Sequence, residues 1–184
     1  MAKENLELIT QKFTDLVKDS FKENLCSIVL YGSAASGNYL AGVSDINILI
    51  ILYESNPAQI FQFGGSAKTQ IIKGRITPQI LTKEEFLGSS DIFPLEYIDL
   101  KTTRKILFGE DVVENLKIAS SNLRHQTESM LRGSIATLRQ VLVASGGREK
   151  TLIQNLTTLG FGQRALFKGL LRLKGIDTAG LTAQ

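Results

Sequence analysis

Two short stretches near the N-terminus decide the fold: residues 27–33 read SIVLYGS, and residues 44–50 read SDINILI. The first is an apolar run that ends in Gly32-Ser33, a pattern typical of a strand followed by a tight turn. The second begins eleven residues after Ser33 and places a carboxylate, Asp45, ahead of another apolar run. Together they predict a strand, a Gly-Ser turn, a short helical connection and a second strand.

The second strand is predicted over Asp45 to Leu52. Successive side chains of a strand point to opposite faces, so Asp45 and Asn47 share one face and stand ~6.6 Å apart. Beyond them both faces are apolar, which is expected of a strand that is covered on both sides at its centre. The polar pair therefore lies at the start of a buried strand.

The order of these residues resembles the signature of the nucleotidyltransferase fold, which polymerase β and the aminoglycoside nucleotidyltransferases share. Their pattern is a Gly-Ser pair, about ten residues, and Asp-x-Asp on a strand. Residues 91–97 and 107–111 and the helix that contains Leu123 and Arg124 resemble a group of bacterial nucleotidyltransferase-domain proteins, over roughly residues 25–145. The resemblance implies an α+β fold with a small mixed β-sheet, flanking helices and a C-terminal helical hairpin or partial bundle.

The same resemblance implies a site. Gly32, Ser33 and Ser44 would hold the triphosphate of a nucleotide, Asp45 would bind Mg²⁺, and Asp45 and Asn47 would be the catalytic pair. Magnesium prefers several converging oxygen ligands, and Asn47 keeps an oxygen but lacks the charge of the second aspartate. The sequence therefore predicts a degenerate metal site.

The family's third carboxylate belongs on a later strand, and residues 77–81 (TPQIL) contain none. Glu96 and Asp99 stay open as substitutes.

Three functions remain open. The first is Mg²⁺-dependent transfer of a nucleoside monophosphate from a nucleoside triphosphate to a small-molecule or protein acceptor. The second is a catalytically inactive regulatory module of the same fold that binds a nucleotide or a partner protein. The third is a module whose helical hairpin docks on a helical partner protein or on a second copy of the chain.

We expect the chain to divide into a nucleotidyltransferase-like domain over residues 1–115 and a C-terminal helical region over residues 120–184. In the first part, apolar spacing predicts a helix over 3–23, and an apolar run predicts a strand over 76–81. Asn56-Pro57, as a cap followed by a first helical residue, predicts a helix toward Lys73. Thr82 and Glu85 form a capping-box pattern that starts another helix, and the alternation over Pro94–Leu100 predicts an edge strand. In the second part, two long helices are expected, ending at Gly146 and at Gly175.

Charge is distributed unevenly along the chain. Residues 1–120 contain 12 Lys/Arg and 15 Asp/Glu, whereas residues 121–184 contain 9 and 3. No aromatic platform accompanies the basic half, so no specific nucleic acid is expected as a partner.

Composition excludes several classes of protein. A single cysteine, Cys26, rules out an intramolecular disulfide and multi-cysteine zinc patterns, and we expect it to be a small buried hydrophobe. The longest apolar run is strand-length and the N-terminus lacks an apolar signal core, so we expect a cytoplasmic protein with no membrane contact. Residues 176–184 end without a third long helix, which leaves open that the chain is part of a longer one.

Overall fold

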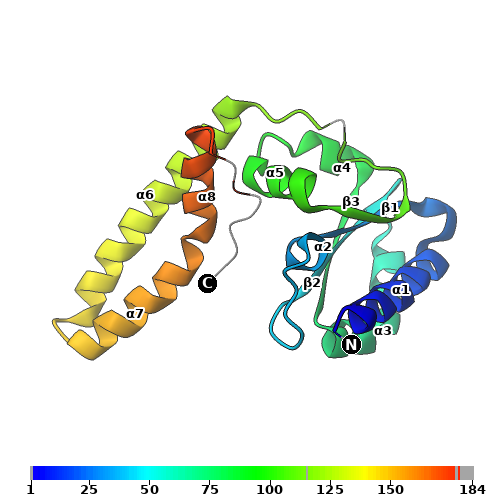
Figure 1. The fold of residues 1–184 in the computed structure, drawn as a ribbon, viewed down its shortest axis with the longest axis horizontal. Helices are drawn as coiled ribbons and strands as arrows, with labels where there is room; N and C mark the ends of the chain where they lie inside the picture. The colour runs from blue at the N-terminus through cyan, green and yellow to red at the C-terminus, as the bar shows by residue number, and fades with distance from the viewer. Residues whose placement is uncertain (1, 115, 177, 179–184) are drawn as a thin grey trace. The chain divides into compact units, whose positions relative to one another are not determined.

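The computed structural model describes residues 2–114, 116–176 and 178. The chain forms two compact units, one made of residues 1–90 and 97–117 and the other of residues 91–96 and 118–184. The first unit is a sheet with helices, and the second is helical (Figure 1). This is the predicted α+β fold class.

The first unit is built on a four-stranded mixed sheet in the order β3-β2-β1-β4. The strands are β1 (Leu25–Tyr31), β2 (Ile46–Leu52), β3 (Ile76–Thr82) and β4 (Lys105–Gly109). β1 runs antiparallel to both β2 and β4, and β2 runs parallel to β3. The predicted strand-turn-strand is confirmed, although β2 begins at Ile46 and Asp45 lies one residue before it.

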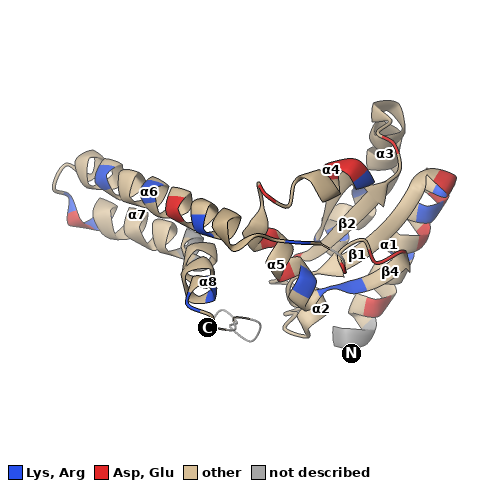
Figure 2. Ribbon diagram, turned by 90° about the horizontal axis from the view of Figure 1, so that it is seen from above, with Lys and Arg blue, Asp and Glu red and all other residues tan. Residues whose placement is uncertain are grey.

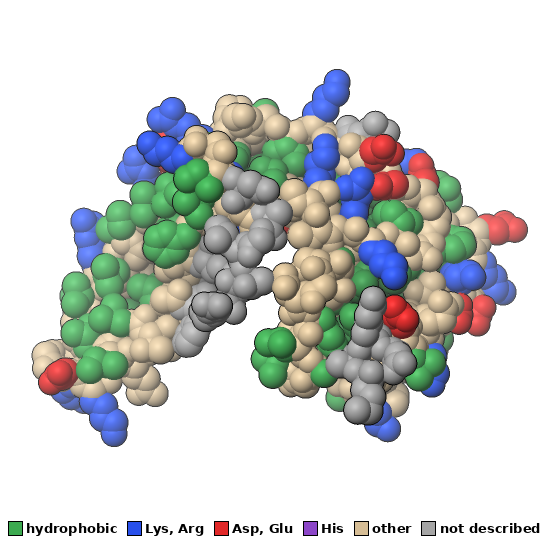
Figure 3. All heavy atoms as spheres, in the orientation of Figure 1, with side chains coloured by type: hydrophobic (Ala, Val, Ile, Leu, Met, Phe, Trp, Pro, Cys, Tyr) green, Lys and Arg blue, Asp and Glu red, His purple; other side chains and the backbone are tan. Residues whose placement is uncertain are grey.

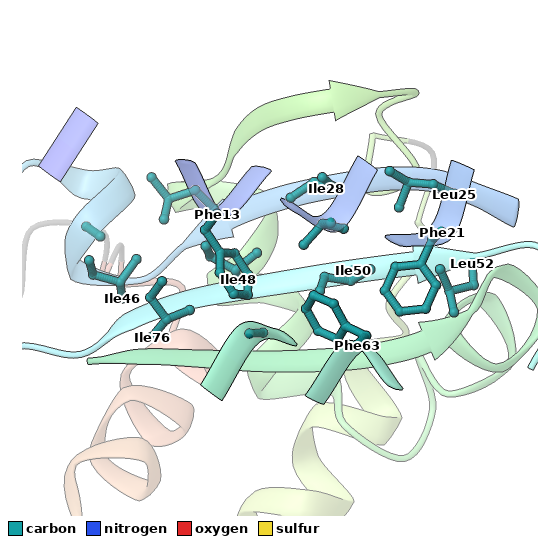
Figure 4. Close-up of a cluster of buried hydrophobic side chains, with 14 residues drawn as sticks. Phe13, Phe21, Leu25, Ile28, Ile46, Ile48, Ile50, Leu52, Phe63 and Ile76 are labelled. Atoms are coloured by element: carbon teal, nitrogen blue, oxygen red, sulfur yellow. The ribbon is translucent and has the colours of Figure 1, made fainter. Parts of the chain in front are cut away.

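One face of the sheet packs against α1 (Ala2–Phe21) and α3 (Pro57–Gly74). Phe13 and Phe21 of α1 meet Phe63 of α3 at ring-centroid distances of 5.9 and 5.0 Å. Figure 4 shows these rings against the isoleucines of β2. The core cluster comprises Phe13, Val17, Phe21, Leu25, Ile28, Leu30, Ala34, Ile46, Ile48, Ile50, Leu52, Phe63, Ala67 and Ile76. The even-numbered residues of β2 therefore point into this core, and Asn47 lies on the opposite face.

Local signals begin the helices as the sequence predicts. The Asn56 side chain accepts a hydrogen bond from the N–H of Gln59, and Pro57 is the first residue of α3. Thr82 and Glu85 form the predicted capping box at the start of α4 (Lys83–Gly88). A 3₁₀ turn, η1 (Lys22–Asn24), joins α1 to β1, and α2 (Ser33–Ser36) follows the Gly-Ser pair.

The expectation of an edge strand over Pro94–Leu100 is wrong, because these residues belong to α5 (Pro94–Thr103). Pro94 suits the first position of a helix, where its missing N–H is not needed. The N–H of Leu95, which has no acceptor within the helix, donates to Gln126 Oε1 at 2.9 Å. Leu95 and Ile98 are also three residues apart, so the apolar pattern fits a helical face as well as an alternation.

The two edge strands of the sheet are instead β3 and β4, and β4 pairs with β1. It ends at Gly109, where the backbone has φ 78° and a Cβ atom would lie 2.1 Å from the carbonyl oxygen of Cys26. Cys26 itself is buried, as predicted, but its thiol also contacts Glu110 Oε1 at 2.8 Å. Burial, followed by the hydrogen bond to Glu110, raises the pKa of this thiol to about 11, so it stays protonated at neutral pH.

The second unit contains α6 (Ser120–Ser145), α7 (Glu149–Gly162) and α8 (Arg164–Leu173). Gly146 ends α6 in the left-handed conformation, as predicted. The prediction that the second long helix is one element is wrong, because this segment is divided at Gln163 into α7 and α8. Gly160 and Gly162 weaken the helix just before this point, and the Gln163 side chain is held by the Ser134 hydroxyl of α6 at 2.7 Å.

Apolar side chains on α6 stay partly exposed. Leu131, Ile135 and Leu142 are 40, 41 and 50% exposed. Figure 3 shows hydrophobic side chains on the visible face of α6, α7 and α8. Figure 2 shows more basic than acidic residues along these three helices. Association of this face with a second copy of the chain or with a helical partner protein stays a prediction.

Within the described residues, no helix combines the length and the apolar character that a membrane crossing requires.

The loop after β4 is held by Asp111, which gives a stability prediction. Its carboxylate accepts hydrogen bonds from Arg104 (Nη2 at 2.7 Å) and from the N–H groups of Val113 and Glu114. Burial alone would raise the pKa of Asp111, but the Arg104 contact and these backbone bonds outweigh it and lower the pKa below its usual value. A lowered folded-state pKa means that this stabilisation is present above the unfolded pKa and is lost as the pH falls through the folded one.

Asp111→Asn should therefore lower the free energy of unfolding by about 1–3 kcal/mol at pH 7. The difference from wild type should shrink as the pH falls below about 4, which is the ordinary aspartate range. Urea unfolding at pH 7 and at pH 3 measures both effects. Asp15→Asn on α1, an exposed position, is the control. An equal effect of the two substitutions at pH 7 would contradict the role given to Asp111.

Candidate functional site

Gly32 forms the turn between β1 and α2. Its backbone has φ 73° and ψ −147°, a combination that residues with a Cβ atom adopt only under strain. Its carbonyl oxygen accepts hydrogen bonds from the N–H groups of Ala35 (3.2 Å) and Ser36 (3.0 Å), which fixes the short helix that begins at Ser33. The first N–H groups of a helix have no acceptor within it. The turn therefore presents backbone donors where the chain leaves the sheet.

Asn47 packs directly against this turn. It pairs in register with Tyr31 of β1 on one side and with Thr77 of β3 on the other. A Cβ atom at Gly32 would lie 3.0 Å from Asn47 Nδ2, so the side chain occupies the space that a residue other than glycine would need. The predicted neighbours Gly32 and Asn47 are therefore brought together.

Asp45 lies at the same end of β2, and its carboxylate is paired with Arg75. Its Oδ1 atom accepts from Arg75 Nε at 3.1 Å and from Arg75 Nη2 at 2.9 Å. Arg75 Nη2 also donates to the carbonyl of Val43 at 3.0 Å. Both partners of the ion pair are about half exposed. Within the part of the chain that the structure describes, no group donates to the other carboxylate oxygen, Oδ2.

Arg75 is the residue of this site that sequence reasoning missed. It follows α3 with φ 52° and ψ 42°, the left-handed conformation that glycine usually takes at a helix end. A residue with a Cβ atom pays roughly 1–2 kcal/mol there. Its carbonyl accepts from the N–H of Ile46 at 2.8 Å, so the residue before β3 lies beside the residue before β2. No local sequence pattern marks Arg75, because the glycine typical of a helix end stands one position earlier, at Gly74.

The neighbouring strand β3 offers an amide in place of a carboxylate. Gln79 Oε1 accepts a hydrogen bond from the Tyr31 hydroxyl at 3.4 Å. This bond links β3 to β1 across β2, in which Leu49 is the residue that pairs with Gln79. Burial raises the pKa of Tyr31, so its hydroxyl stays protonated and remains a donor at neutral pH. Glu96 and Asp99, the residues left open as a third acid, lie on α5 and not on a strand.

Ser44 has a local role in the loop before β2. Its hydroxyl accepts from the N–H of Leu40 at 3.1 Å, and its own N–H donates to the carbonyl of Leu40 at 2.8 Å. These two bonds close the turn that leads into Asp45. Its predicted contact with a phosphate stays a prediction.

With Asp45 paired to Arg75, the residues at this end of the sheet fit a divalent cation poorly. The possible metal ligands are the carboxylate of Asp45, the side-chain amides of Asn47 and Gln79, and hydroxyl groups. The carboxylate of Asp45 is neutralised by its ion pair with Arg75. Magnesium sites use hard, charged oxygen ligands that converge on the ion. Among the described residues, no group of three or more His, Cys, Asp or Glu side chains could hold a metal.

Comparison with known proteins gives two matches of different kinds. Residues 11–118, more than half of the chain, match the family model of the nucleotidyltransferase domain. The fold resembles that of the spectinomycin adenyltransferase AAD(9) from Enterococcus faecialis, solved with ATP and spectinomycin. The two chains are 13% identical with a TM-score of 0.50, and the match covers 97% of this chain and 92% of the other. A search of curated proteins gave no match.

The family match spans both strands of the predicted signature and β3 beside them. The likeness to the adenyltransferase concerns the fold alone, because the identity is low. Proteins with this domain generally transfer nucleotidyl groups from nucleoside triphosphates and use a divalent metal ion. On the family match, this chain belongs to the nucleotidyltransferase domain family.

Proposed function

We propose that this chain binds a nucleoside triphosphate at the Gly32–Ser33 turn and acts as a binding module in which nucleotidyl transfer is lost. One observation carries the proposal: the turn of the family is intact and packs on Asn47, while the one aspartate of the motif is paired with Arg75. The turn offers backbone N–H groups, which bind phosphate oxygens well.

The charges at the site support the proposed loss of transfer. Nucleotidyl transfer requires attack on the α-phosphorus while pyrophosphate leaves, and the family's carboxylates hold the cations that stabilise both oxygens. Here Asn47 and Gln79 are neutral amides, and the Asp45–Arg75 pair has no net charge. Among the described residues at this end of the sheet, the side chains therefore carry no net negative charge with which to concentrate divalent cations beside the triphosphate.

A slow transferase is the second candidate, because Asp45 Oδ2 accepts no hydrogen bond within the described part of the chain. In that case Asp45 would be the metal ligand with Asn47 as its weak partner, and Mg²⁺ the ion. The acceptor would be a small hydroxylated molecule or a protein side chain. The adenyltransferase with the similar fold was solved with spectinomycin, which favours the small molecule. For either candidate we propose a cytoplasmic location, because nucleoside triphosphates are abundant there.

Isothermal titration of the wild-type protein with ATP, GTP, CTP and UTP tests the proposal. We expect saturable binding of at least one triphosphate with one site per chain, and a corresponding rise in thermal stability. Weaker binding of the monophosphate would show that the phosphates, and not only the base, are held. Absence of saturable binding up to millimolar concentrations of all four triphosphates would contradict the proposal.

A further inference from the structure

The Asp45–Arg75 pair has a consequence for the form in which the nucleotide binds. We infer that the Arg75 guanidinium stands in for the divalent cation, so that the site takes the metal-free triphosphate. The inference rests on the proposed function, since it concerns the same site. It goes further by naming the charged species that binds and the residue that selects it.

Arg75 is held in place but keeps donors for a ligand. Nε and Nη2 are fixed by Asp45 Oδ1 and by the carbonyl of Val43, at distances of 2.9 to 3.1 Å. Nη1 carries two further N–H groups, and nothing within the described residues accepts from them. The Arg75 side chain is 46% exposed, which leaves part of it open to a ligand from solvent. A planar guanidinium with two available donors matches a phosphate group.

The backbone keeps Arg75 beside the motif. Its left-handed conformation ends α3, and its carbonyl bonds to the N–H of Ile46, the first residue of β2. Asp45 precedes that residue, and Asn47, which packs on Gly32, follows it. The guanidinium therefore belongs to the same end of the sheet as the Gly32–Ser33 turn. A glycine at position 75 would relieve the backbone but would supply no cation.

Charge decides between the metal-free and the metal-bound ligand. A divalent cation brought to Asp45 would approach the positive guanidinium, which repels it. A triphosphate that already carries Mg²⁺ has less negative charge, so it is attracted less by Arg75. The site should therefore bind free triphosphate at least as tightly as its magnesium complex, the reverse of a site with two aspartates.

Titration of the full chain with the triphosphate that binds most tightly tests this, once in EDTA and once in excess Mg²⁺. Wild type should bind in EDTA, and Mg²⁺ should leave the affinity unchanged or lower it. Arg75→Gly should lose about 10- to 100-fold in affinity in EDTA, as expected for a lost charge-assisted hydrogen bond. Because this variant frees Asp45, Mg²⁺ should now raise its affinity. Lys68→Ala, which removes an exposed charge from α3, is the matched control and should change neither titration.

The outcomes separate the two proposals. Binding that requires Mg²⁺ in the wild type would overturn the inference and leave the proposed nucleotide site standing. Binding in EDTA that Arg75→Gly does not weaken would also overturn it, provided that circular dichroism shows the variant folded. Absence of binding under both conditions would overturn the inference together with the proposed function. Since glycine suits the backbone at position 75, we expect the variant to fold.

Discussion

Gly32→Val should abolish triphosphate binding, lowering the affinity at least 100-fold. The backbone at Gly32 has φ 73° and ψ −147°, where a β-branched residue is strained. The new Cβ atom would lie 3.0 Å from Asn47 Nδ2, so this amide would have to shift to make room for it. The turn would then lose its geometry, and the free energy of unfolding should fall by about 1–3 kcal/mol.

Gly37→Ala is the control for this experiment. Gly37 lies at the other end of α2, also at positive φ (82°), but a Cβ atom there meets nothing within 4 Å. It should cost about 1 kcal/mol of stability and leave binding within twofold of wild type. Urea unfolding and calorimetric titration measure the two effects separately. If Gly32→Val binds the triphosphate as wild type does, the turn is not the phosphate site.

Asn47→Asp should make triphosphate binding depend on Mg²⁺. The substitution would place a second carboxylate two residues after Asp45, ~6.6 Å from it along the chain direction. Without metal, the added negative charge repels the phosphates, and the affinity should fall roughly tenfold. Added Mg²⁺ should restore it. Release of pyrophosphate should stay undetectable, because Gln79 and the Asp45–Arg75 pair are unchanged.

Asn56→Asp supplies the same change of charge at the other end of β2. Aspartate can replace asparagine as the cap of α3, so this variant should keep the wild-type response to Mg²⁺ and its stability. Titration in EDTA and in Mg²⁺ compares the three proteins. If Asn47→Asp responds to Mg²⁺ no differently from wild type, Asn47 does not face the phosphates. If it releases pyrophosphate at enzyme rates, the rest of a transferase site is intact and the second candidate function is correct.

Much of the fold follows from local signals. The strand-turn-strand around Gly32 could be predicted because each signal is short in sequence: an apolar run, a glycine that must turn, and a second apolar run. The caps at Asn56 and Thr82 are local for the same reason. Pro94–Leu100 was misassigned because its apolar spacing fits both a strand and a helix, and Pro94 together with the distant Gln126 decides for the helix.

The candidate site was predictable in part. Gly32, Asp45 and Asn47 could be found because the motif fixes their spacing on one turn and one strand. Arg75 could not, since its contact with Asp45 depends on the parallel pairing of β2 with β3 across 30 residues. Pairing between distant strands is a property of the folded sheet and not of either segment alone. The polar character of Gln79 was visible in the sequence, but its contact with Tyr31 was not.

An NMR titration of ¹⁵N-labelled wild-type protein in EDTA, with the triphosphate that binds most tightly, tests the central claim most directly, and a mass of 20.2 kDa suits the method. We expect saturable shifts of the backbone amides of Gly32, Ser33 and Asn47 and of the Arg75 side chain, with the triphosphate left intact. Shifts confined to other parts of the chain, or no shifts at millimolar concentrations of any of the four triphosphates, would contradict this expectation.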